Sequence, residues 1–158
     1  MTSRLAFQPS AKSTFFNPSS GPYQMHPVLL INELLSIIFE YAYEEDPADV
    51  AVLARTCRAF MEPALNELWA CQLNLAPLIM CTPGDLWAGE PLEDGHARLD
   101  FLRQPIDSDW ARFDFYARRI PEFDLYPFKQ LSVPIFTALA QRQPCTPILP
   151  NLRRLEWW

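Results

Sequence analysis

The chain has 158 residues, of which 49% are apolar and 20% are charged, a composition typical of a folded globular protein with one main core. Thirteen Lys and Arg against nineteen Asp and Glu give a net charge of −6, which argues against affinity for nucleic acid or anionic lipid. Sixteen Pro and only four Gly exclude a glycine-rich phosphate loop, and no apolar run reaches the about 18 residues of a membrane span.

The spacing of cysteine and histidine gives no sign of a metal or cofactor site. The four cysteines form no C-x-x-C pair, and the two histidines lie at no ligand-like spacing from them or from each other. Cys57, between Arg55 and Arg58, is interpreted as a buried, unreactive thiol rather than a nucleophile. We therefore expect reduced thiols in an intracellular protein of the cytoplasm or nucleus, with no metal, no cofactor and no membrane partner. A structural zinc site is the minor alternative.

Residues 1–26 are predicted to be a disordered leader. They contain Arg4 and Lys12, no acidic side chain and many Ser, Thr and Pro, so they cannot bury enough apolar surface to fold. The same features leave an organelle transit peptide as a weaker alternative.

The segment from Leu29 to Tyr43, LLINELLSIIFEYAY, predicts a helix with an unusual surplus of apolar surface. Glu33, Ser36 and Glu40 lie three and four residues apart on one narrow face, and nearly all other positions are apolar. Asn32 is placed where an N-cap would be. One neighbouring helix cannot cover so much apolar surface.

Two more helices are predicted directly afterwards. Asp46 is a good N-cap with Pro47 at the first helical position, and this second helix is expected to run to about Phe60. Pro63 is expected to open a third helix, which Pro77 ends. Its apolar residues at helical spacing are Leu65, Leu68, Trp69 and Leu73. Because the connections are short, the three helices are expected to form a small bundle over residues 27–75.

Residues 76–150 are predicted to be a connector with helices near 107–120 and 132–142. Its part 82–106 is interpreted as an acidic surface segment with at most a short helix near 96–103. In residues 151–158 the spacing of Leu152, Leu155 and Trp157 is that of the opening strand of a leucine-rich repeat, of which this would be a truncated start. The predicted fold class is all-α.

No catalytic role is assigned, and we expect the protein not to be an enzyme. The acidic residues that could form a catalytic pair are Asp107, Asp109 and Asp114. They fall at a predicted helix start and on its exposed face, and no His accompanies them. A DNA-binding helix-turn-helix around 47–75 is excluded, since no Lys or Arg occurs from Glu62 to Leu75.

Three segments between Leu30 and Trp69 share the pattern of one known family. They are LINELLSIIF, LARTCRAF and LNELW, and together they resemble an F-box. Ile31 stands where the family usually has Pro, and Phe60 where Trp is commoner. The segments PLIMCTPGDLW, DWARFDFYARRI and LPNLRRLEW resemble the region after the F-box in mushroom-type fungal F-box proteins, whose leucine-rich repeats begin near such a sequence.

The resemblance implies a partner and a function. F-box proteins bind the Skp-type adaptor of a cullin-RING ubiquitin ligase and hold a protein substrate through a separate domain, here one that would follow Trp158. The residues that the resemblance places at or just behind the adaptor contact are Leu30, Ile31, Leu34, Leu35, Ile38, Leu53, Cys57, Leu68 and Trp69. Trp69 is the expected anchor, since buried aromatic residues dominate binding energy.

One alternative uses the same apolar surface differently. A helical scaffold protein could form a homodimer through it, with no adaptor involved.

Overall fold

The computed structural model describes residues 26–91, 97–125, 131–142 and 147–157. These residues fall into two compact units, 26–70 and 71–157. The leader predicted over residues 1–26 lies outside the described residues, except for His26. Among the described residues, no helix combines the length and the apolar character that crossing a membrane requires.

The prediction of an all-α fold is wrong. About 52% of the described residues are helical and 18% lie in strands. A three-stranded parallel sheet has the order β1-β4-β5, and β2 pairs with β3 in an antiparallel sheet. The strands are β1 (Cys71–Gln72), β2 (Trp87–Pro91), β3 (Ala97–Phe101), β4 (Glu122–Leu125) and β5 (Arg154–Trp157). The protein is therefore a mixed α and β protein.

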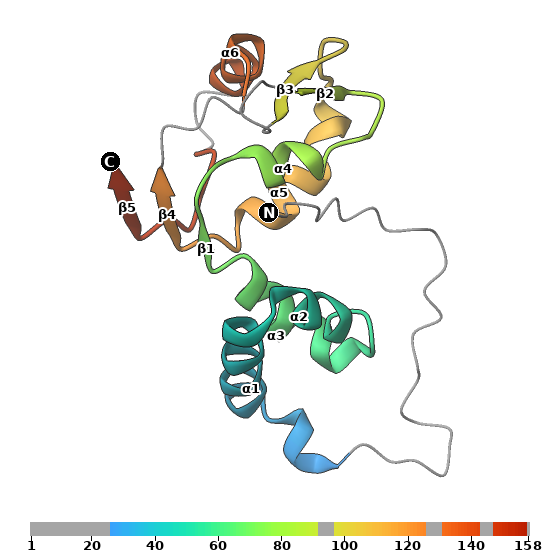
Figure 1. The fold of residues 1–158 in the computed structure, drawn as a ribbon, viewed down its shortest axis with the longest axis vertical. Coiled ribbons are helices and arrows are strands. Elements are labelled where there is room, and N and C mark those ends of the chain that lie inside the picture. The colour runs from blue at the N-terminus through green and yellow to red at the C-terminus, as the bar shows by residue number, and fades with distance from the viewer. Residues whose placement is uncertain (1–25, 92–96, 126–130, 143–146, 158) are drawn as a thin grey trace. The chain divides into compact units, whose positions relative to one another are not determined.

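All regular elements of the unit 26–70 are helices (Figure 1). Its elements are η1 (Pro27–Leu30), α1 (Asn32–Glu45), α2 (Pro47–Leu53) and α3 (Arg58–Leu68), and α1 packs against both α2 and α3. The most buried side chains are Leu35, Phe39, Val50, Cys57 and Ala64. The ring of Phe39 meets that of Phe60 edge to face, with 5.6 Å between the centroids, which fixes α1 on α3.

The ends of these helices differ in part from the prediction. Asp46 caps α2 as predicted, its Oδ1 accepting from the backbone N–H of Ala48 at 2.8 Å. However, α2 ends at Leu53, and Cys57 has extended backbone angles before α3 begins. Pro63 lies inside α3 and does not open it. Asn32 is the first residue of α1, and Ile31 occupies the N-cap position without a side-chain bond.

The unit 71–157 combines both sheets with helices. These helices are α4 (Ala76–Met80), η2 (Asp107–Trp110), α5 (Ala111–Ala117) and α6 (Val133–Gln141). The largest fully buried side chains of this unit are Phe113, Leu78, Ile79, Leu86, Ile120 and Ile135. The prediction of a short helix near 96–103 is wrong, because Ala97–Phe101 forms β3. This strand pairs with β2 from Trp87↔Phe101 to Pro91↔Ala97.

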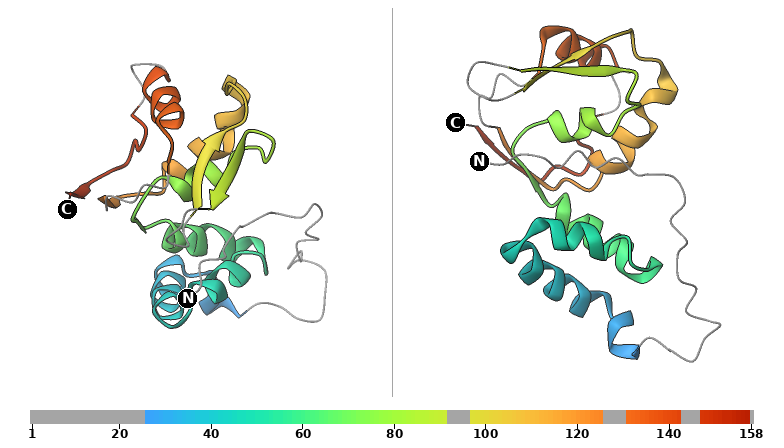
Figure 2. Two further views of the ribbon diagram at one scale, coloured as in Figure 1. Left: turned by 45° about the horizontal axis from the view of Figure 1, so that its top comes forward. Right: turned by 45° about the vertical axis from the view of Figure 1, so that its right-hand side comes forward.

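Helix α6 is attached to β3 at its first turn. The backbone N–H of Ser132 donates to the carbonyl of Leu99 at 3.0 Å, and the Ser132 hydroxyl donates to Oδ1 of Asp100 at 2.6 Å. Figure 2 shows α6 beside the β2-β3 pair from two further directions. The buried Ser132 therefore attaches the start of α6 to β3.

The parallel sheet places one apolar face in the core and leaves part of it open. β4 and β5 pair from Glu122↔Arg154 to Leu125↔Trp157. Phe123 of β4 is buried, whereas Leu155 and Trp157 of β5 are 55% and 76% exposed. The parallel strand β5 thus lies within residues 151–158, where the start of a leucine-rich repeat was predicted. That this strand belongs to such a repeat stays a prediction.

Candidate functional site

The exposed face of α1 carries a continuous row of apolar side chains. Ile31, just before the helix, and Leu34, Ile38 and Tyr41 within it are 44%, 38%, 45% and 68% exposed. They are spaced three or four residues apart, so they lie along one line of the helix surface. We call these four residues the apolar row.

A second side of the same helix, about 100° around from the apolar row, is fully covered. Leu35 and Phe39 are each 1% exposed, because they face α2 and α3. A helix of a small bundle normally buries its apolar stripe and exposes polar residues. α1 instead presents a second apolar stripe, and such a patch usually marks a partner-binding surface.

An acidic row runs beside the apolar row. Glu33, Glu40 and Glu44 are exposed, and their spacing of seven and four residues places them on one line that also includes the exposed Ile37. Neighbouring helix positions differ by about 100° in direction, so this row adjoins the apolar row along its length. We call Glu33, Glu40 and Glu44 the acidic row.

The acidic row extends toward α3 through Glu67. Burial raises the pKa of the half-buried Glu67, and the negative charge of Glu40 raises it further. Residues 26–70 contain eight acidic side chains and only two basic ones, Arg55 and Arg58. This unit accordingly has a net charge of −6, equal to that of the whole chain.

The structure separates the predicted contact residues into three groups. Ile31, Leu34 and Ile38 are exposed on one line of α1, whereas Leu35 and Cys57 are buried at 1% and 4% exposure. The half-buried residues are Leu53, Leu68 and Trp69. Leu30 ends η1, and its side chain lies outside the described set.

Four exposed apolar residues of this unit were not among the predicted contacts. They are Val28, Ile37, Tyr41 and Val52. The sequence could have indicated Tyr41, which lies seven residues after Leu34 and three after Ile38. Val52 is 63% exposed on α2, but nothing in the sequence distinguishes it from the buried Val50.

Two of the three acidic residues considered as catalytic candidates, Asp109 and Asp114, have structural partners, and the third, Asp107, is exposed. Asp109, 5% exposed, accepts from Nη1 and Nη2 of Arg103 at 2.6 and 3.0 Å and from the Ile106 N–H at 2.9 Å. The Arg103 bonds, and next the Ile106 N–H, lower the pKa of Asp109. Asp114 accepts from Arg142 at 2.7 and 2.8 Å. These ion pairs join Asp109 of η2 to the segment after β3, and Asp114 of α5 to the end of α6.

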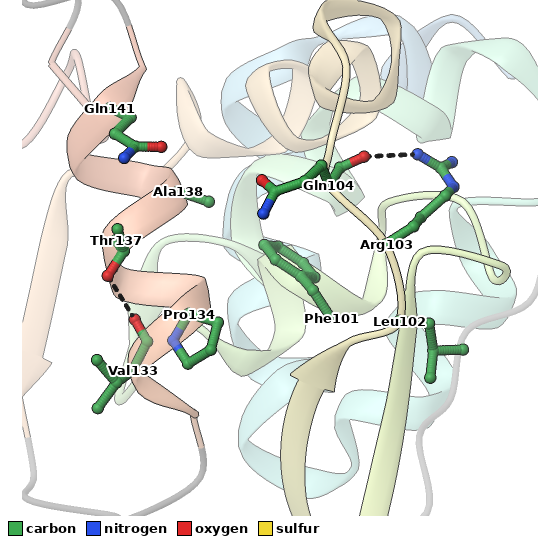
Figure 3. A pocket seen from close by; sticks show the side chains of 9 residues that line it. All are labelled: Phe101, Leu102, Arg103, Gln104, Val133, Pro134, Thr137, Ala138 and Gln141. Atoms are coloured by element: carbon green, nitrogen blue, oxygen red, sulfur yellow. Dashed lines mark hydrogen bonds between the residues drawn. The ribbon is translucent and has the colours of Figure 1, made fainter.

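A pocket of about 590 Å³ lies between α6 and the segment that follows β3 (Figure 3). Phe101 and Gln104 line one side of it, and Pro134, Ala138 and Gln141 of α6 line the other. Arg103 also borders the pocket, but Asp85 and Asp109 both pair with its guanidinium. The pocket therefore offers no unpaired charge, and the Thr137 hydroxyl that lines it donates to the Val133 carbonyl at 3.0 Å.

Cysteine chemistry offers no stronger candidate. Burial raises the pKa of Cys81 to about 11, and Cys71 donates to Oδ2 of Asp124 at 3.6 Å, with burial and then Asp124 raising its pKa. Within the described ranges, no group of three or more His, Cys, Asp or Glu is arranged to hold a metal ion.

Comparison of the chain with protein-family models, with curated proteins and with solved structures finds no match.

Proposed function

We propose that residues 27–75 act as an F-box-type module, and that the protein is the substrate-receptor subunit of a Skp-cullin-F-box ubiquitin ligase. The observation that carries the proposal is the apolar row of α1, which is exposed although the helix already buries Leu35 and Phe39 in its own bundle. An amphipathic helix that enters an apolar groove is a common mode of protein recognition, and this surface has the side chains for it. An intracellular location, in the cytoplasm or nucleus, is part of the proposal.

The charge of the unit favours a different partner over a second copy. A two-fold homodimer joins identical surfaces, so two units of net charge −6 would meet. Like charges close together at an interface are unfavourable. Homodimerisation through the apolar row is therefore the weaker explanation of this surface.

The proposal divides the work between two parts of the protein. The F-box-type module would bind the adaptor, and a protein substrate would be held by another part, as the resemblance to the F-box family implies. No residue is assigned to that substrate.

The test is binding of the full chain to a purified Skp-type adaptor. Ile38→Asp places a charge in the apolar row, and Val133→Asp is the matched control, since Val133 is a 76% exposed apolar residue of the unit 71–157. We expect the wild type and Val133→Asp to bind alike and Ile38→Asp to bind at least about tenfold more weakly, with circular dichroism unchanged. A wild type that does not bind, or an Ile38→Asp variant that binds like the wild type, would overturn the proposal.

A further inference from the structure

The three carboxylates of the acidic row are exposed on α1. Glu33, Glu40 and Glu44 form no ion pair with any residue that the structure describes. They are spread along α1 and adjoin the apolar row along one side. A partner protein whose groove covers the apolar row must therefore place one rim of that groove next to these three carboxylates.

That arrangement restricts the chemistry of the rim. Carboxylates at the border of an interface lose part of their hydration, and this loss is offset when the partner supplies complementary charge. A rim that carried Asp or Glu would instead repel the acidic row. The apolar row thus restricts the floor of the groove to apolar side chains. The acidic row restricts one rim of the groove to side chains that are not acidic.

We infer that the partner of α1 is a protein groove with an apolar floor and with Lys or Arg side chains along the rim that faces Glu33, Glu40 and Glu44. The inference rests on the proposed function, and it describes the surface of the Skp-type adaptor that receives the helix. The basic rim fixes the direction in which α1 lies in the groove, because the reverse direction moves the acidic row to the other rim.

The experiment measures binding of the full chain to a Skp-type adaptor by calorimetry at about 50 and 500 mM NaCl, concentrations that differ strongly in screening. The test variant carries Glu33→Gln, Glu40→Gln and Glu44→Gln together. Gln is a good helix former, so α1 should persist, and circular dichroism checks this. The matched control carries Glu90→Gln, Asp107→Asn and Glu156→Gln, which change the net charge equally but lie in the unit 71–157.

We expect the wild type and the control to lose affinity strongly between low and high salt. The test variant should bind about tenfold more weakly than the wild type at low salt and depend much less on salt. If it instead binds like the wild type and wild-type binding is insensitive to salt, the basic rim is wrong while the proposed function stands. If the wild type shows no binding at either salt concentration, both are overturned. The salt series on the wild type needs no variant, so binding that is insensitive to salt would overturn the basic rim even if the triple variant failed to fold.

Discussion

Leu34 and Leu35 are consecutive residues of α1, yet Leu34 is 38% exposed and Leu35 only 1%. The first belongs to the apolar row, and the second faces α2 and α3. The same residue type therefore lies on the surface at position 34 and in the core at position 35.

Leu35→Ala should destabilise the unit 26–70 by about 2 to 5 kcal/mol, since truncation of a buried Leu leaves a cavity. Leu34→Ala should hardly change the melting temperature, but should weaken adaptor binding by about 2 kcal/mol, roughly thirtyfold. Thermal melts followed by circular dichroism, together with binding titrations, measure both effects. If Leu34→Ala unfolds the protein, or if both variants melt and bind normally, the assignment of the two faces is wrong.

Glu67→Gln should stabilise the protein at neutral pH. The folded state raises the pKa of Glu67, through burial and then Glu40, so the folded state binds its proton more tightly than the unfolded state does. The resulting destabilisation is present at neutral pH and disappears as the pH falls below the unfolded value of about 4.5. We expect Glu67→Gln to raise the melting temperature by a few degrees at pH 7 and not at pH 4. The exposed Glu44→Gln serves as the control, and an equal gain there would contradict the explanation.

Asp109→Asn should destabilise the unit 71–157, because the amide cannot replace the carboxylate that holds Arg103 and the Ile106 N–H. The folded state lowers the pKa of Asp109, so its contribution is present at neutral pH and is lost as the pH falls through the lowered folded-state value. The melting temperature should fall by several degrees at pH 7, and the difference from the wild type should shrink below about pH 4. Asp107→Asn, at an exposed position two residues earlier, should change little at either pH.

Cys81 should resist alkylation in the folded protein. Burial raises its pKa from the ordinary value of 9.0 to about 11, which lowers its thiolate fraction roughly a hundredfold near pH 8. The half-buried Cys71 should react with iodoacetamide sooner, and mass spectrometry of the labelled peptides gives both rates. In concentrated urea the two rates should converge; faster labelling of Cys81 than of Cys71 in the native protein would contradict the buried position.

The helices of residues 26–70 were predictable because their signals are local. The spacing of Glu33, Ser36 and Glu40 fixes the period of α1, and Asp46 with Pro47 marks the start of α2. Whether Leu34 or Leu35 faces the core was not predictable, because this depends on where α2 and α3 pack. The apolar surplus could be inferred from the sequence, but its division into core and surface could not.

The strands were missed for a different reason. β1 has two residues, and β2 contains Gly89, Glu90 and Pro91, which are all rare in strands. β3 does alternate, with Ala97, Leu99 and Phe101 separated by Arg98 and Asp100, but five residues are too few to separate this pattern from a short helix. The pairing of β1, β4 and β5 joins distant segments, and no local signal reports it.

The pairing of those three strands also affects the order in which parts of the protein fold. Cys71 and Asp124, whose side chains are hydrogen-bonded, lie 53 positions apart, and Arg154 and Glu122 lie 32 apart. The contacts of residues 26–70, by contrast, join neighbouring helices, and local contacts form fastest. On the ribosome, where chains emerge at about 5–20 residues per second and fold from the N-terminus, α1 is complete well before β5 is made. The apolar row is therefore exposed to other proteins while the parallel sheet is still being synthesised.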